Sequence, residues 1–218
     1  MKSISILLLT TSLVTLIACK KDRVSGSGPV ITVTRAVTNF TRIQVSGSTN
    51  VFVTQGAGFK VEVNGYANLI PYFETRLVNN TLELGYKNNT TVKNDNIKIL
   101  VTLPVLNGLT ISGSGNIFTS GIFDNNPVFE THIAGSGNIN FSQGTAQNFI
   151  STIAGSGSVY AFGMQAVHAD IIISGSGNQE ITAGNNLKVN IAGSGNVYYK
   201  GTPVINVHIS GSGAVIPR

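Results

Sequence analysis

One tripeptide, Gly-Ser-Gly, recurs through the second half of the chain at nearly constant spacing. Its copies begin at Gly113, Gly135, Gly155, Gly175, Gly193 and Gly211. Successive copies are 22, 20, 20, 18 and 18 residues apart. A repeat of this length is typical of architectures in which a single unit cannot bury its apolar face and gains stability by stacking on its neighbours. The spacing therefore predicts a stack of similar rungs.

The residues before each tripeptide alternate between apolar and polar. The position two residues before the first glycine is apolar and β-branched: Val45, Ile111, Ile133, Ile153, Ile173, Ile191 and Ile209. The position before that is mostly polar: Gln44, Thr110, His132, Thr152, Ile172, Asn190 and His208. A period of two predicts half-buried β-strands. We expect each Gly-Ser-Gly to form the corner between two strands, because glycine permits positive φ.

These patterns predict an all-β fold, a parallel β-helix-like solenoid with Gly-Ser-Gly corners. A rung with about four inward aliphatic side chains gains roughly 6–12 kcal/mol, at 1.5–3 kcal/mol for each burial. Ordering its residues costs ~1–2 kcal/mol each, so one rung of ~20 residues cannot fold alone. The variable earlier intervals favour a right-handed solenoid, although the closing intervals of 18 also fit the hexapeptide repeat of left-handed ones.

Residues 30–218 are predicted to form one domain, with an irregular β section at 30–104 and regular rungs at 105–218. The irregular section contains alternating segments without the tripeptide period. We expect strands at 30–37, 41–53, 60–63, 73–78, 81–86 and 96–103. Asn64-Gly65 and Asn79-Asn80 have the composition of tight turns. No segment predicts a helix.

The start of the chain indicates export. An apolar run from Ile4 to Ile17 is too short to span a membrane comfortably but has the length of a signal-peptide core. It ends in Leu16-Ile17-Ala18-Cys19, which resembles the lipobox of bacterial lipoproteins. We expect residues 1–18 to be a signal peptide, Cys19 to carry lipid, and residues 19–29, with the Gly26-Ser27-Gly28 copy, to be a tether. This placement predicts a cell-envelope protein, anchored in the outer membrane on its periplasmic face or at the cell surface.

Charge and cysteine content narrow the functional classes. The net charge of +5 is scattered, and the longest basic run is Lys20-Lys21, which does not favour a nucleic-acid partner. Cys19 is the only cysteine, so no internal disulfide can form.

The distribution of ionisable side chains does not predict catalysis, a metal site or a cofactor. Lyase chemistry on acidic polysaccharides needs a base together with cations. Residues 99–187 contain no Lys or Arg, and the acids in the rungs are isolated in the sequence: Asp124, Glu130, Asp170 and Glu180. His132 and His208 occupy the same position relative to the tripeptide but lie four rungs apart. At the spacing of β-strands this is roughly 19 Å, which is too far for them to bind one ion.

An asparagine column follows the tripeptides, at Asn116, Asn138, Asn178 and Asn196. Stacked amides can hydrogen-bond along a solenoid, so we expect a structural ladder. A polar recognition strip is the alternative.

Several stretches together resemble the family described as "putative auto-transporter adhesin, head GIN domain". They are Phe40–Ser48, Asn50–Gly56, Asn68–Tyr72, Leu100–Pro104 and the Ile-Ser-Gly-Ser-Gly-Asn-Ile rungs. The resemblance covers about residues 30–218. It implies an exported β-helix-like domain, often tethered as a lipoprotein, for which adhesion has been proposed.

Two functions follow as expectations. The first is a non-catalytic adhesion or binding module, with a membrane contact through the lipid and a glycan, a protein or another copy of the chain as partner. The second is a purely structural envelope protein, and a polysaccharide-acting enzyme is a distant third. The candidate binding strip is Phe118, Tyr160 and Tyr198, which recur five residues after the first glycine and should face outward. The alternative is that residues 29–104 or the segment 125–129 cover them.

Overall fold

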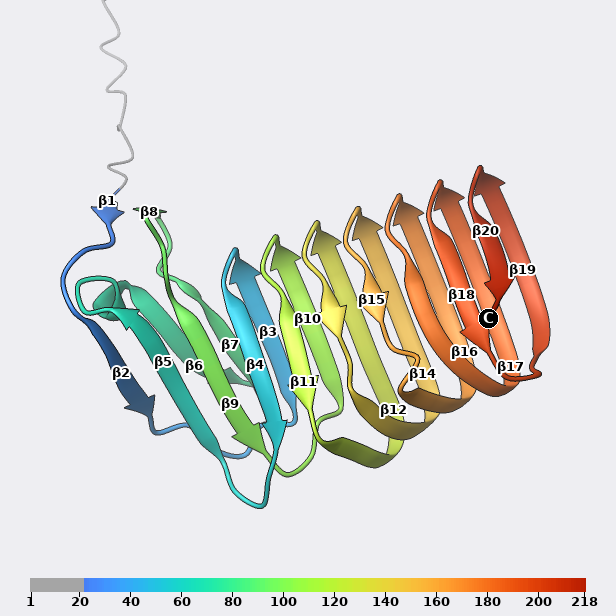
Figure 1. Cartoon of the computed structure of the whole chain (residues 1–218), viewed down its shortest axis with the longest axis horizontal. Coiled ribbons are helices and arrows are strands. Elements are labelled where there is room, and N and C mark those ends of the chain that lie inside the picture. Colours follow the sequence, from blue (N-terminus) through green and yellow to red (C-terminus); the bar gives the residue numbers. More distant parts are fainter. Residues whose placement is uncertain (1–21) are drawn as a thin grey trace, which may run out of the picture.

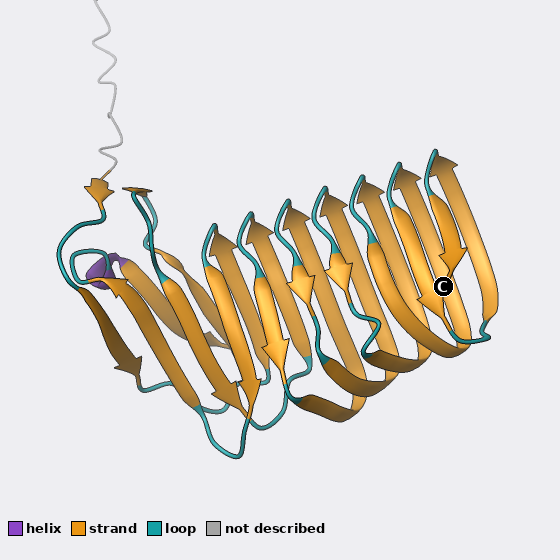
Figure 2. Ribbon diagram, viewed as in Figure 1, coloured by secondary structure: helices purple, strands orange, loops and turns teal. Residues whose placement is uncertain are grey.

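The computed structural model describes residues 22–218 and confirms the predicted all-β solenoid of about six turns (Figures 1 and 2). In these residues the helical structure is limited to one short 3-10 turn, η1 (Ile70–Tyr72). No helix in this part of the chain is long and apolar enough to cross a membrane.

Two sets of parallel strands form the regular rungs. The strands that lead into the corners make the entry sheet. They are β3 (Arg42–Gly47), β10 (Gly108–Gly113), β12 (Ile122–Gly135), β14 (Gln143–Gly155), β16 (Met164–Gly175), β17 (Gln179–Gly193) and β19 (Val204–Gly211). The strands that leave the corners make the exit sheet. They are β4 (Asn50–Gln55), β11 (Ile117–Ser120), β13 (Ile139–Asn140), β15 (Val159–Tyr160), the start of β17, β18 (Asn196–Lys200) and β20 (Ala214–Pro217).

The corners stack in register, as the repeat predicts. The first glycine of each tripeptide pairs with the first glycine of the next rung, beginning with Gly47, the degenerate copy. These glycines in the six full copies adopt φ between 129° and 136°, a region that L side chains rarely enter. The carbonyl oxygen of Gly135 accepts hydrogen bonds from the N–H groups of Ser156 (2.9 Å) and Gly157 (3.1 Å), and the other corners repeat this pattern.

The structure confirms the predicted alternation of buried apolar and outward-facing side chains in the entry strands. Ile111, Ile133, Ile153 and Ile173 are fully buried, whereas His132 and Ile172 are exposed. Ile209 belongs to the same inward column but is 36% exposed, because β19 is the last rung and no further strand of the described chain stacks on it. Stacked β-branched side chains therefore form a core that runs along the solenoid and is open at its last rung.

The irregular section packs at the other end of the stack (Figure 1). Its strands are β2 (Val30–Arg35), β5 (Lys60–Tyr66), β6 (Phe73–Val78), β7 (Thr81–Tyr86) and β9 (Lys98–Leu103). β7 pairs in parallel with β3, and β9 with β4, so the section continues both sheets. β5, β2 and β6 then add as antiparallel strands.

Three local predictions in this section have different outcomes. The turn at Asn79-Asn80 is confirmed, with φ of 47° and 61°. The single strand predicted at 41–53 is two strands, because the Gly47 corner divides it. The turn predicted at Asn64-Gly65 is wrong, because both residues lie within β5. A Cβ atom on Gly65 would be 2.4 Å from Cδ1 of Ile97, so this glycine permits close packing inside a strand.

The segment expected to be a tether is partly structured. β1 (Asp22–Ser25) pairs in parallel with β8 (Thr90–Lys93). Gly26 is buried, its N–H donates to the carbonyl oxygen of Lys93 (2.8 Å), and its own carbonyl oxygen accepts from Nδ2 of Asn94 (2.8 Å). Gly26 of the Gly26-Ser27-Gly28 copy is therefore held against the domain by hydrogen bonds. Cys19 and the predicted signal peptide at 1–18 lie outside the described residues.

Candidate binding surface

An outward row of side chains crosses the exit sheet along the solenoid axis. Strand register brings together Phe52, Phe118, Asn140 and Tyr160, and then Glu180, Tyr198 and Ile216. Val159 pairs with Gln179, which places Tyr160 beside Glu180. We call these seven residues the aromatic row.

The three aromatic residues of the predicted strip all belong to this row. Phe118 is 36% exposed and Tyr160 is 43% exposed, so neither residues 29–104 nor the segment 125–129 buries them. Tyr198 is half-buried, and the guanidinium carbon of Arg218 lies 4.7 Å from its ring centroid. The row is thus an accessible surface, with a cation–π contact at Tyr198.

Two further aromatic residues extend this surface. Phe52 is exposed and stacks on Phe118, with ring centroids 5.3 Å apart and planes at 14°. The sequence could have indicated this residue, because Phe52, like Phe118, stands five residues after the first glycine of its corner. Phe162 lies two residues beyond Tyr160, and Nζ of Lys200 sits 4.5 Å from its ring centroid. Sequence reasoning missed Phe162, because its column is otherwise filled by polar side chains.

Glu180 brings a carboxylate into the middle of the aromatic row. Burial raises its pKa, and the positive charges of Lys200 and Arg218 act in the opposite direction. The exit sheet therefore combines aromatic rings, an amide, one acid and two cations on a flat and rigid support.

The inward neighbour of Glu180 is polar, and the core satisfies it. Gln179 occupies a column of valines and isoleucines and is fully buried. The hydroxyl of Ser151 donates a hydrogen bond to Oε1 of Gln179 (2.6 Å). The hydroxyl of Thr131 in turn donates a hydrogen bond to Oγ of Ser151 (2.8 Å). Because these groups are paired inside the solenoid, they stabilise the stack and offer nothing to a ligand.

The asparagine column is the structural ladder that the sequence predicts. Nδ2 of Asn138 donates to Oδ1 of Asn116 (3.1 Å), and Nδ2 of Asn196 donates to Oδ1 of Asn178 (3.2 Å). Ser158 continues the ladder where the column lacks asparagine: its N–H donates to Oδ1 of Asn138 (3.0 Å). These amides bind one another along the corners, which argues against a recognition strip.

Two ion pairs join ionisable side chains of the rungs. Glu130 binds Arg42, and Asp170 binds Lys188 at 2.9 Å. His168 contacts Nδ2 of Asn186 through Nδ1 (2.9 Å). Among residues 22–218 no group of three or more His, Cys, Asp or Glu side chains lies close enough to hold a metal ion.

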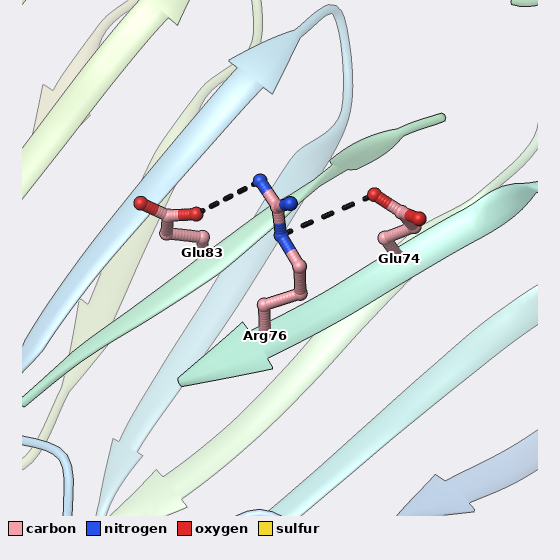
Figure 3. Close-up of polar contacts among 3 residues, drawn as sticks. All are labelled: Glu74, Arg76 and Glu83. Atoms are coloured by element: carbon pink, nitrogen blue, oxygen red, sulfur yellow. Dashed lines mark hydrogen bonds and ion pairs between the residues drawn. The ribbon is translucent and has the colours of Figure 1, made fainter. Parts of the chain in front are cut away.

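A second charged group lies in the irregular section (Figure 3). Nη2 of Arg76 is 3.1 Å from Oε2 of Glu83 on β7, and Nε of Arg76 is 4.0 Å from Oε2 of Glu74 on β6. All three side chains are partly exposed, so each ion pair contributes at most about 1 kcal/mol. We interpret this group as a surface contact between neighbouring strands.

The fold is a stacked β-solenoid, and its exit sheet carries an exposed aromatic row. The family model described as "Putative auto-transporter adhesin, head GIN domain" matches residues 39–203. The chain therefore belongs to this family. An adhesin-like family indicates a location at the cell envelope or cell surface.

Solved structures share the fold. The chain is similar to a "putative adhesin" from Bacteroides fragilis (TM-score 0.75, 22% identity), with 89% of this chain and 100% of that one covered. A "putative lipid binding protein" from Parabacteroides distasonis gives a TM-score of 0.62 at 25% identity, with 90% and 100% covered. A "putative adhesin" from Parabacteroides merdae gives 0.57 at 22% identity, with 90% and 99% covered. The comparison with curated proteins finds no match. The description of the family as an adhesin favours a non-enzymatic function.

Proposed function

We propose that this chain is a non-catalytic adhesion module of the bacterial cell envelope, anchored through lipid on Cys19 and binding its partner through the aromatic row. The observation that carries the proposal is the exposure of Phe52, Phe118 and Tyr160 in one line on one sheet. Large exposed apolar side chains gathered on a soluble domain typically mark an interaction surface.

The rigidity of the exit sheet supports recognition. Each central strand of this sheet is hydrogen-bonded to a strand on either side, so the rings are held in place before a partner arrives. A pre-organised surface loses less conformational entropy on binding. The rings, the amide of Asn140 and the carboxylate of Glu180 together suit a sugar chain or a protein surface with apolar and polar groups.

The position of β1 supports the proposed anchor. β1 lies at the end of the solenoid opposite to the last rung (Figure 1). A lipid on Cys19, three residues before β1, would leave the exit sheet accessible along its length. Two or three acyl chains would hold the protein firmly, because each buried methylene contributes roughly 0.8 kcal/mol.

Exposure on intact cells tests the proposal. The side chains of Lys60 and Lys188 are more than half exposed, so a membrane-impermeant amine-reactive biotin should label the chain. We expect labelling in intact cells at the level found after lysis, with a periplasmic protein as the unlabelled control. Labelling only after lysis would exclude an adhesin and favour the structural envelope protein.

A further inference from the structure

An elongated groove of about 680 Å³ crosses the bends through which β12, β14, β16 and β17 reach the entry sheet. Its polar lining comes from successive rungs and includes Asn125, Thr145, Gln147, Gln165, Thr182 and Asn185. A smaller hollow of about 460 Å³ shares Thr145 and Gln165 with it and adds the ring of Phe162. The groove therefore lies beside the aromatic row but has its own set of residues.

The geometry of the bends follows from small residues and from breaks in strand register. Ala146 pairs with Ala166, and Ala166 pairs with Ala183, so the same small residue lines the groove on three neighbouring strands. The register shifts between Phe123 and Asn126, and again between Ala166 and His168. Such bulges bend a strand and redirect its side chains.

The first rung of the groove is fixed by a hydrogen bond. Asn125 adopts a left-handed backbone conformation, with φ of 60°, and its N–H donates to Oγ1 of Thr145 (2.9 Å). The end of the groove at β12 is thereby held on β14.

The groove is uncharged. None of the residues that line the larger hollow is Asp, Glu, Lys, Arg or His, and Asp124 is the one charged residue of the smaller hollow. Amide and hydroxyl side chains both donate and accept hydrogen bonds. A charged ligand would find no counter-ion in the larger hollow, and an acyl chain would cover amides without replacing their hydrogen bonds, which is costly. The lining thus favours a neutral ligand rich in hydroxyl groups.

The groove is also periodic. Thr145, Gln165 and Thr182 lie in register on neighbouring strands, roughly 4.8 Å apart. From Asn125 to Thr202 the groove spans four rung steps, roughly 19 Å. A ligand that repeats the same groups along its length can therefore make the same contacts at each rung.

A sugar chain matches this arrangement better than a peptide. Its rings offer hydroxyl groups to the amides and an apolar face to the alanines of the bends. An extended peptide binds by adding to a free strand edge, but β14 and β16 already pair with a neighbour on each side.

We propose that this groove binds a single chain of a neutral polysaccharide that lies along the solenoid axis. The groove and the aromatic row are separate sites, and the groove goes beyond the proposed function. An experiment can therefore exclude the polysaccharide site without excluding partner binding by the aromatic row, and the reverse.

The test uses the mature chain, purified from membranes in detergent, and four probes: the linear hexasaccharides of cellulose, xylan, mannan and laminarin. Isothermal titration calorimetry should detect binding of at least one. A Gln147→Ala, Gln165→Ala double variant should weaken that binding about tenfold or more, since it removes two exposed amide side chains. The matched control is Asn190→Ala, which removes an outward amide from the entry sheet.

Three results would overturn the proposal. The first is a failure of all four hexasaccharides to bind. The second is binding that the glutamine variant leaves unchanged and that a Tyr160→Ser, Tyr198→Ser variant abolishes, which would move the sugar site to the aromatic row. The third is binding to phosphatidylcholine vesicles that the glutamine variant abolishes while sugar binding is unchanged, which would make the groove a lipid site.

Discussion

A Cβ atom added to Gly155 would lie 2.2 Å from the carbonyl oxygen of Gly135 in the preceding rung. The same distance, 2.2–2.3 Å, recurs at the other full Gly-Ser-Gly corners between the first glycine and its predecessor. Each corner therefore excludes a side chain for two reasons, positive φ and contact with the rung below.

This contact predicts a large effect of a single methyl group. Gly155→Ala should lower the free energy of unfolding by at least about 2 kcal/mol, because the backbone must leave its conformation and the corner must move. Gly58→Ala is the control, since nothing lies within 4 Å of its added Cβ atom and its φ is not in the left-handed region. Urea denaturation measures both, and equal midpoints would show that the corner tolerates a side chain.

The alternation of the rungs predicts opposite outcomes for neighbouring residues. Ile153→Asp buries a charge in the middle of the stack and should leave the domain unfolded or nearly so. Thr152→Asp points outward from the same strand and should change the free energy of unfolding by about 0.5 kcal/mol or less. Thermal melting followed by circular dichroism distinguishes them, and equal melting temperatures would refute the assigned faces.

The open last rung refines this prediction. Ile209 occupies the column of Ile153 but is partly exposed, so Ile209→Asp should destabilise the chain far less than Ile153→Asp. If both variants unfold alike in the same assay, the last rung is covered in solution.

The aromatic row predicts a variant that folds but does not bind. Tyr160→Ser with Tyr198→Ser removes two outward rings and should keep the melting temperature within a few degrees while abolishing partner binding or self-association. Ile150→Ser with Ile172→Ser is the control, because these side chains are about as exposed as Tyr160 but face outward from the entry sheet. Sedimentation velocity and adhesion of coated beads provide the readouts. Unfolding of the tyrosine variant, or unchanged binding, would contradict the assigned surface.

Glu180 predicts a dependence of stability on pH. Burial raises the pKa of its carboxyl above its ordinary value of 4.5, so the folded chain holds this proton more tightly than the unfolded chain. The free energy of unfolding should therefore fall as the pH rises from 4.5 through the pKa of the folded state. Glu180→Gln should remove this contribution and flatten the curve. Melting temperatures of both proteins between pH 4 and 7 provide the measurement, and parallel curves would contradict the prediction.

The lipobox-like sequence predicts the effect of one further substitution. Cys19→Ala should prevent lipidation, leave the precursor unprocessed by the lipoprotein pathway, and release the protein from its membrane or misplace it. Fractionation of cells with immunoblotting measures this. Normal processing and membrane retention of the variant would exclude Cys19 as the anchor.

The repeated parts of the fold could be predicted from the sequence because each column is sampled once in every rung. Val51, Ile117 and Val159 repeat the same environment, so one exception such as Gln179 does not obscure the pattern. The aromatic row could be predicted for the same reason, because strand parity fixes the side on which Tyr160 lies.

The remaining features depend on contacts that occur once. Gly65 lies in a strand because Ile97 packs against it, and the pairing of β1 with β8 joins segments about 68 residues apart. No local rule anticipates either contact. The groove was missed because it arises where the register shifts, and an alignment on the glycines cannot show a shift that occurs between them.

The corner glycines also constrain how such a chain can change its length during evolution. All intervals between them are even, and the rungs shorten from 22 to 18 residues while the corners stay in register. Because side chains alternate with a period of two, a pair of residues can be gained or lost between corners without exchanging the buried and exposed faces. A single-residue insertion within a strand would turn an inward isoleucine to the solvent. Insertions in pairs at the bends can therefore reshape the outer surface of the solenoid while its core is inherited unchanged.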